Sequence, residues 1–115
     1  MSLIPILGGI PQAAAVIDAT SVGGSVSFDS NSGFTSVTRS SKGLYLLVLS
    51  RDIQSTKLCC LVSVKAPNNT TKSNSSGSYR ITATSPTTIE VNTNDNGGYG
   101  DIDADFSIAV YAITT

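Results

Sequence analysis

The chain has 115 residues, a formal net charge of −1, no His and no Trp. A chain of this length forms one domain around a single core and needs no metal or disulfide framework to fold. The absence of His excludes a Ser-His-Asp or Cys-His nucleophile pair and a His-based zinc site, so we expect no enzymatic activity and no cofactor. A near-neutral charge also argues against a nucleic-acid partner, whose phosphates attract a basic face.

The first residues are apolar, but they are too few to cross a bilayer. The run at residues 3–7 is about a third of the length that a membrane-spanning helix requires, and two prolines interrupt it. No Lys or Arg precedes this run, as one would in a secretory signal, so we expect cytosolic synthesis and no membrane partner. We interpret residues 1–11 as an extended N-terminal arm and residues 12–115 as the folded domain.

Short β-type runs, separated by turn sequences, make up the rest of the chain. Gly, Asn, Asp, Ser and Pro gather between the runs, and no segment predicts a helix. The predicted strands are residues 13–19, 24–29, 34–39, 44–50, 57–65, 78–84, 88–93 and 105–113. Eight regularly spaced short strands are typical of an all-β fold with a single antiparallel β-sandwich. The strand order is left open between jelly-roll and immunoglobulin-like.

Alternation of apolar and polar residues predicts which strand faces are buried. The rows expected in the core are Tyr79, Ile81 and Ala83 in the sixth strand and Phe106, Ile108, Val110 and Ala112 in the last. Residues 44–49 and 58–62 are apolar on both faces. This pattern predicts central strands that are covered twice, by a second sheet or by another subunit.

Cys59 and Cys60 are neighbours in the fifth predicted strand. Adjacent strand residues point to opposite faces, so a disulfide between the two is geometrically poor. We interpret them as reduced thiols that pack as small buried hydrophobic residues.

Asp101, Asp103 and Asp105 are the candidates for a metal site. Carboxylates at alternate positions share one face of an extended segment, and their spacing resembles half of an EF-hand calcium loop. The Gly after the third acid and the Glu at the twelfth position are both absent, and Ala112 occupies the latter position. We therefore favour an exposed strand edge whose like charges discourage pairing, with calcium binding as the alternative.

Charge is distributed unevenly along the chain. Residues 36–80 hold all seven Lys and Arg and one Asp, whereas residues 81–115 hold five acids and no base. If these regions reach different edges of the sandwich, copies could meet edge to edge with complementary charge. The alternative, which we favour, is that strands from both regions interleave and their charges neutralise locally.

Two segments carry a resemblance to a known group of proteins. Residues 33–48, GFTSVTRSSKGLYLLV, resemble a hairpin of the form xVxSVTxxxxGxYxVxF that recurs in bacteriophage tail-fibre and other virion surface domains. Residues 105–111, DFSIAVY, are similar to the closing strand of those domains. Together they cover about a fifth of the chain, and Leu44 precedes Tyr45 where a polar residue is more usual. The resemblance implies a homotrimer exposed on virions and brings no catalytic residue.

Within this resemblance we expect a capsid decoration or cement protein, because the chain starts at Met1 with no fibrous shaft before it. The implied partners are other copies of the chain and the major capsid protein, on a virion assembled in the host cytoplasm. The residues expected to dock are those of the apolar arm: Leu3, Ile4, Ile6, Leu7 and Ile10.

The alternative is a tail-fibre tip or receptor-binding module that contacts the host surface. Its contacts would lie in the polar segment 68–77, which we predict to be a surface loop, and in segment 94–100. The candidate contact residues are Asn68, Asn69, Asn74 and Tyr99.

Overall fold

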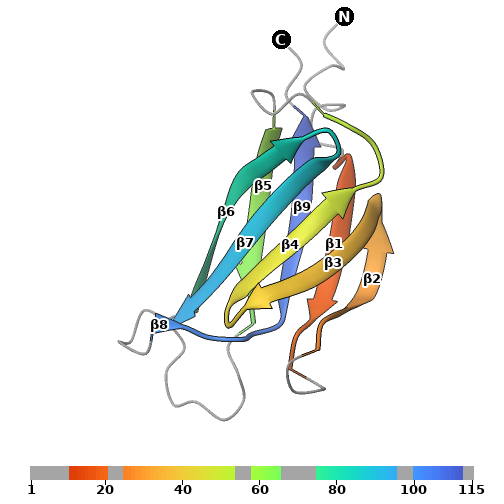
Figure 1. The fold of residues 1–115 in the computed structure, drawn as a ribbon. Coiled ribbons are helices and arrows are strands. Elements are labelled where there is room, and N and C mark those ends of the chain that lie inside the picture. The colour runs from red at the N-terminus through yellow and green to blue at the C-terminus, as the bar shows by residue number, and fades with distance from the viewer. Residues whose placement is uncertain (1–10, 21–24, 54–57, 66–74, 96–99, 113–115) are drawn as a thin grey trace, which may run out of the picture.

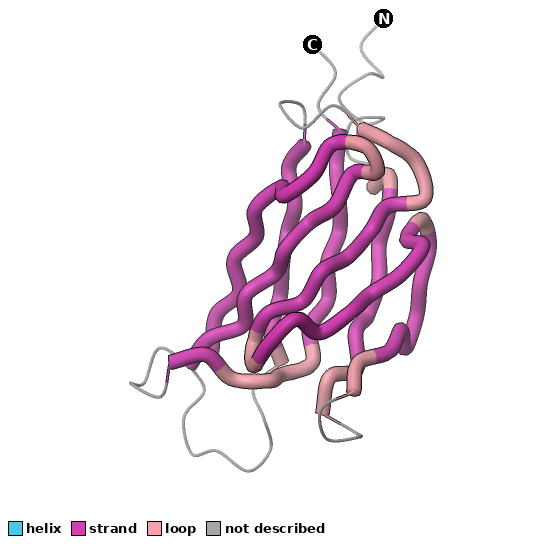
Figure 2. The backbone as a smooth tube through the Cα atoms, in the orientation of Figure 1, coloured by secondary structure: helices cyan, strands magenta, loops and turns pink. Residues whose placement is uncertain are grey.

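The computed structural model describes residues 11–20, 25–53, 58–65, 75–95 and 100–112. Within these ranges the chain consists of strands joined by loops, with no helix (Figure 2). Two antiparallel sheets lie one behind the other and pack face to face (Figure 1). The predicted all-β sandwich is therefore confirmed.

The described residues form nine strands. They are β1 (Ala13–Asp18), β2 (Ser27–Ser32), β3 (Phe34–Ser41), β4 (Leu44–Leu49), β5 (Leu58–Val64), β6 (Ser75–Thr84), β7 (Thr87–Asp95), β8 (Gly100–Asp101) and β9 (Phe106–Ala112). One sheet has the order β2-β1-β9-β5. The other has the order β3-β4-β7-β6, and β8 adds a short pairing to β7. All eight predicted strands are present, and only the two-residue β8 was not predicted.

Two strands begin elsewhere than the sequence pattern predicts. β2 begins at Ser27 rather than at residue 24, and it continues through Ser32, which pairs with Ala14 of β1. β6 begins at Ser75, inside the predicted loop 68–77, because its first residues pair with the end of β7. Both are edge strands of mostly polar composition, so backbone pairing with a neighbour determines where they begin, and their side chains give little alternation to detect.

The core lies between the sheets and is formed by alternate residues of their central strands. Its largest fully buried side chains are Tyr45, Phe106, Ile17, Leu47, Ile89, Ile108, Val91 and Val110. The rings of Tyr45 and Phe106 come from opposite sheets and lie 5.3 Å apart between centroids. This pair is therefore a direct aromatic contact across the sandwich.

One predicted core row is confirmed and the other is partly wrong. Phe106, Ile108 and Val110 are buried, and Ala112 is half-buried at the end of β9. In the sixth predicted strand, Ile81 is half-buried, but Tyr79 is 37% exposed and Ala83 is exposed. β6 is an edge strand, which leaves Tyr79 uncovered on one side. A register shift between Ile81 and Ala83 turns Ala83 to the outer face of the sheet.

Candidate functional site

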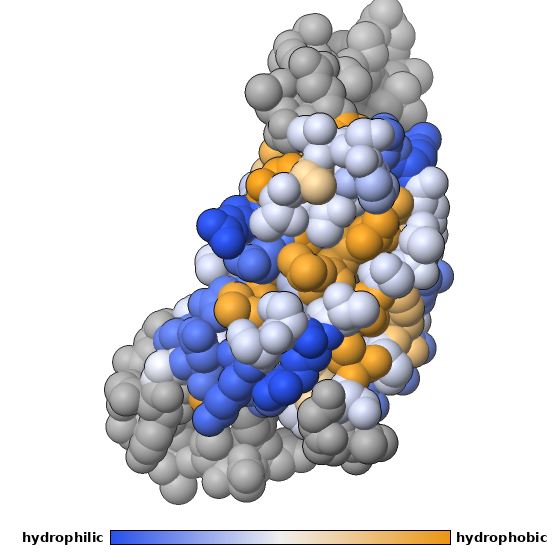
Figure 3. Space-filling view, in the orientation of Figure 1, coloured by the Kyte–Doolittle hydropathy of each residue, from blue (hydrophilic) through white to orange (hydrophobic). Residues whose placement is uncertain are grey.

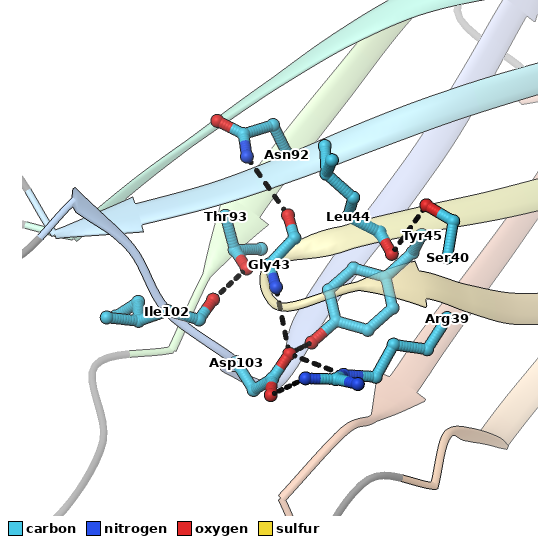
Figure 4. Close-up of polar contacts among 9 residues, drawn as sticks. All are labelled: Arg39, Ser40, Gly43, Leu44, Tyr45, Asn92, Thr93, Ile102 and Asp103. Carbon is cyan, nitrogen blue, oxygen red and sulfur yellow. Dashed lines mark hydrogen bonds and ion pairs between the residues drawn. The ribbon is translucent and has the colours of Figure 1, made fainter.

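A polar cluster at one end of the sandwich is centred on Asp103, in the segment between β8 and β9 (Figure 4). Its carboxylate accepts two hydrogen bonds from Arg39, at 3.0 Å from Nε and 2.8 Å from Nη2. It also accepts the backbone N–H of Gly43 at 2.9 Å and the hydroxyl of Tyr45 at 2.6 Å. One carboxylate therefore joins the β3–β4 hairpin to the segment that leads into the other sheet.

The charge states in this cluster suit a structural role. The hydrogen bonds from Arg39 lower the pKa of Asp103 to about 2. Burial, followed by the hydrogen bond to Asp103, raises the pKa of Tyr45 well above its usual range. A general acid or base works best with a pKa near the operating pH. An ionised Asp103 beside a neutral Tyr45 hydroxyl is instead a stable hydrogen-bonded pair at neutral pH.

The hairpin turn that reaches Asp103 depends on a glycine. Gly43 has φ of +73°, and a Cβ at this position would lie 2.7 Å from the carbonyl oxygen of Thr93. The Gly43 carbonyl accepts the N–H of Thr93 at 2.8 Å and the side-chain amide of Asn92 at 3.0 Å. The Thr93 hydroxyl in turn donates to the carbonyl of Ile102. The turn, β7 and the 102–105 segment are thus held together by backbone groups as well as by Asp103.

The three candidate metal-binding carboxylates do not come together. Asp101 accepts hydrogen bonds from the side chains of Asn92 and Asn94. Asp105 accepts the backbone N–H of Ala19 at 2.8 Å and the hydroxyl of Thr20 at 2.9 Å. Among the described residues no group of three acids or cysteines is placed to hold a metal ion.

The strand-edge interpretation of these acids is also wrong for Asp103 and Asp105. Both follow β8 in a segment outside any strand. Each is used as a hydrogen-bond acceptor for a different part of the chain.

The two ion pairs that the structure describes join residues of the basic region to residues of the acidic region. Arg39 pairs with Asp103 and Arg80 with Glu90, both at 2.8 Å. Each pair joins a base from residues 36–80 to an acid from residues 81–115. For these four groups the interleaving of basic and acidic regions is confirmed.

The two cysteines are free thiols with different surroundings. Cys60 faces the core and is buried, whereas Cys59 is exposed on the outer side of β5. The prediction of opposite faces is confirmed, and the prediction that both are buried is wrong for Cys59. Among the described residues, no second layer covers the outer face of β5 at Cys59.

The predicted docking arm and ligand-contact loops lie outside the described residues. This applies to Leu3, Ile4, Ile6, Leu7 and Ile10 in the arm and to Asn68, Asn69, Asn74 and Tyr99 in the loops. Their roles stay predictions. The candidate surfaces that the structure does describe are the outer faces of the two sheets.

The outer face of the β3-β4-β7-β6 sheet carries an aliphatic stripe along β4. Leu44, Leu46 and Val48 alternate with the buried residues of this strand and are half-buried. Figure 3 shows apolar surface in the middle of this face with hydrophilic surface around it. The cross-strand neighbours of Leu46 are Thr38 on β3 and Glu90 on β7. Because residues 44–49 are apolar on both faces, the sequence predicted that both faces of this strand would be buried. Within the described residues the inward side chains are buried and the outward ones are only half-buried.

The outer face of the β2-β1-β9-β5 sheet is hollowed. Small side chains, among them Ala14, Ala109 and Ser107, line a hollow of about 410 Å³. Val16 and Leu61 border it, and they are two of the three exposed large hydrophobic residues among those described. Sequence reasoning missed this surface. The signal in the sequence was that Val16 and Leu61 occupy outward positions in their strands, where a polar residue is usual.

Comparison of the chain with protein-family models, with curated proteins and with solved structures finds no match. None of the described residues forms a helix that is long and apolar enough to cross a membrane.

Proposed function

We propose that this chain is a structural virion protein that decorates and reinforces a phage-like capsid. The observation that carries the proposal is the β3–β4 hairpin. The segment that resembles virion surface domains folds as this hairpin, and its outward face is the stripe of Leu44, Leu46 and Val48. Leu44 stands where the virion surface domains more often have a polar residue, and here it lengthens the apolar stripe.

Such a protein would bind and reinforce the shell by burying apolar surface against the capsid subunits. An aliphatic stripe on the outer face of a sheet stabilises a complex by roughly 25 cal/mol for each Å² of apolar surface removed from water. One such contact is weak, and an oligomer that contacts several capsid subunits gains avidity through effective concentration. The resemblance implies a homotrimer for this purpose. Arg39, Tyr45 and Asp103 hydrogen-bond to one another, so they stabilise the β3–β4 hairpin that carries the stripe.

The test is co-sedimentation with shells of the major capsid protein that lack minor proteins. We expect saturable binding at a fixed number of copies per shell, measured by gel densitometry. Leu46→Asp should weaken this binding by about tenfold or more, because it places a charge in the centre of the contact. Thr82→Asp, at an exposed position of the edge strand β6, is the matched control and should bind as the natural chain does.

Deletion of residues 2–11 tests the predicted arm in the same assay. A decoration protein that docks through this arm loses shell binding when it is deleted. The alternative function, a tail-fibre tip or receptor-binding module, predicts no binding to intact shells by any variant and retention of a host-surface ligand by the deletion variant. Absence of binding by the natural chain would therefore overturn the decoration role.

A further inference from the structure

A short segment that crosses between the two sheets is held by two carboxylates. Residues 102–105, which we call the strap, follow β8 of one sheet and lead into β9 of the other, and they lie outside any strand (Figure 1). Asp103 accepts the backbone N–H of Gly43, in the turn between β3 and β4, at 2.9 Å. Asp105 accepts the backbone N–H of Ala19, directly after β1, at 2.8 Å. The strap is therefore bonded to strand ends of both sheets.

These two contacts are close enough in the chain to depend on each other. Only Ala104 separates the residues that carry the carboxylates, and it is fully buried. The N–H of Ile102 also donates to the carbonyl of Thr93 at 3.1 Å. A displacement that breaks the bond at Asp105 therefore reaches Asp103 through a single linking residue. Contacts that share a short backbone segment in this way are coupled rather than additive.

The strap closes the end of the core at which the two sheets make their aromatic contact. Tyr45 donates its hydroxyl to Asp103 at 2.6 Å (Figure 4), and Phe106 directly follows Asp105. The two aromatic residues are 0% and 1% exposed, and their ring centroids lie 5.3 Å apart. Displacement of the strap would therefore uncover both rings, because it removes the partner of the Tyr45 hydroxyl and moves the chain that precedes Phe106.

We propose that the strap opens as one unit, in which the contacts of Asp103 and Asp105 break together while the central strands stay paired. Opening releases the β3–β4 turn and the end of β1, and it uncovers the rings of Tyr45 and Phe106. A segment outside the strand pairing opens locally at a lower free energy than the paired core. The fold then holds an apolar surface that only its open state presents. This inference goes beyond the proposed function and does not depend on it.

The first test is amide hydrogen exchange of the full chain, followed by NMR. The N–H groups of Gly43 and Ile102 should exchange through one common opening, faster than the amides of β4 and β9. Asp105→Ala should speed exchange at Gly43 by at least about fivefold relative to those amides, although Asp103, the acceptor of Gly43, stays in place. Asp29→Ala is the matched control, since Asp29 is exposed and lines the same hollow of about 340 Å³ as Asp105. It should change the rate at Gly43 by less than about twofold.

The second test is a double-mutant cycle measured by urea denaturation. Asp103→Ala and Asp105→Ala in one chain should lower the free energy of unfolding by clearly less than the sum of the two single losses, because either substitution releases the strap. Asp52 provides the matched control beyond the other end of β4, where its carboxylate accepts the N–H of Thr87 at 3.1 Å. The losses from Asp103→Ala and Asp52→Ala should be additive, because these sites share no segment.

If Asp105→Ala does not fold, Thr20→Val takes its place. This substitution leaves the strap intact and removes the hydroxyl that donates to Asp105 at 2.9 Å, so it should speed exchange at Gly43 by about threefold. An unchanged rate at Gly43, or equal acceleration of Gly43 and of the amides of β4 and β9, would overturn the proposal. Additive losses from Asp103→Ala and Asp105→Ala would overturn it as well. Capsid binding is tested separately by the shell assay, so failure of the decoration role leaves these results unchanged.

Discussion

Arg39 and Asp103 are 64 residues apart in the sequence and meet in a bidentate ion pair, with Nε–Oδ1 and Nη2–Oδ2 distances of 3.0 and 2.8 Å. Arg39 lies on β3 of one sheet, and Asp103 precedes β9 of the other. Paired N–H donors fix both the distance and the orientation of a carboxylate. The pair therefore positions the segment in which the chain crosses between the two sheets.

Asp103→Ala should lower the free energy of unfolding by about 2–3 kcal/mol, because it leaves Arg39 and the buried Tyr45 hydroxyl without their acceptor. Urea denaturation measures this loss. Asp101→Ala is the matched control, since its carboxylate accepts only from the side chains of Asn92 and Asn94 at the surface. We expect this control to change stability by no more than about 0.5 kcal/mol. Equal losses in the two variants would contradict a special role for Asp103.

The same carboxylate should make stability depend on pH. The pKa of Asp103 is lowered to about 2 in the folded chain, against about 3.9 for Asp in an unfolded chain. Because the folded-state pKa is the lower one, ionised Asp103 contributes its full stabilisation above about pH 4, and this contribution is lost as the pH falls toward 2. Urea denaturation between pH 7 and pH 2 should show the difference between the natural chain and Asp103→Asn narrowing over this range. A difference that stays constant down to pH 2 would exclude this titration.

Strands are predicted correctly where the pattern of apolar residues within the strand itself marks them. The prediction fails where backbone pairing with a neighbouring strand determines the bounds or the buried face. The sequence of β9 alternates between residues expected in the core and outward ones, so both its position and its core face were predictable. The sequence of β4 is apolar at every position, which predicts where the strand lies and leaves open which of its faces is buried. β2 has one half-buried Phe among exposed polar residues, and only its pairing with β1 places it. Ala83 alternates correctly with Ile81 in sequence, but a register shift that depends on β7 turns it outward.

The candidate sites were less predictable because they join residues that are remote in the sequence. Asp101, Asp103 and Asp105 attracted attention as a local pattern, yet each one contacts a different part of the chain. The row that contains Leu61, Ala109 and Ala14 exists only once β1 and β5 are known to flank β9. No periodicity within one strand carries that information.

The two cysteines should differ in reactivity. Cys60 is 6% exposed, and burial raises the pKa of its thiol to about 12, whereas Cys59 is exposed. The thiolate is the reactive form. At pH 8 and low protein concentration, we expect maleimide to add once to the folded chain and twice in denaturant, as measured by mass spectrometry. Cys59→Ser should take up none while folded, and rapid labelling of that variant would contradict the burial of Cys60.

Two glycines with the same backbone angle should respond differently to a methyl group. Gly43 and Gly100 both have φ of +73°, so replacement by Ala strains each backbone by a similar amount, about 1–2 kcal/mol. A Cβ at Gly43 would also lie 2.7 Å from the carbonyl oxygen of Thr93, whereas a Cβ at Gly100 meets nothing within 4 Å. Gly43→Ala should therefore destabilise the fold by about 1–3 kcal/mol more than Gly100→Ala, because the hairpin must move away from β7.

Urea denaturation of the two variants side by side separates the steric effect from the shared backbone strain. The same movement at Gly43 would pull its N–H from Asp103, so Gly43→Ala should also reduce the pH dependence assigned to that carboxylate. Gly100→Ala should leave the pH dependence unchanged. Equal destabilisation by both substitutions would mean that the turn at Gly43 has room for a side chain, and the close approach of Gly43 to Thr93 would then be wrong.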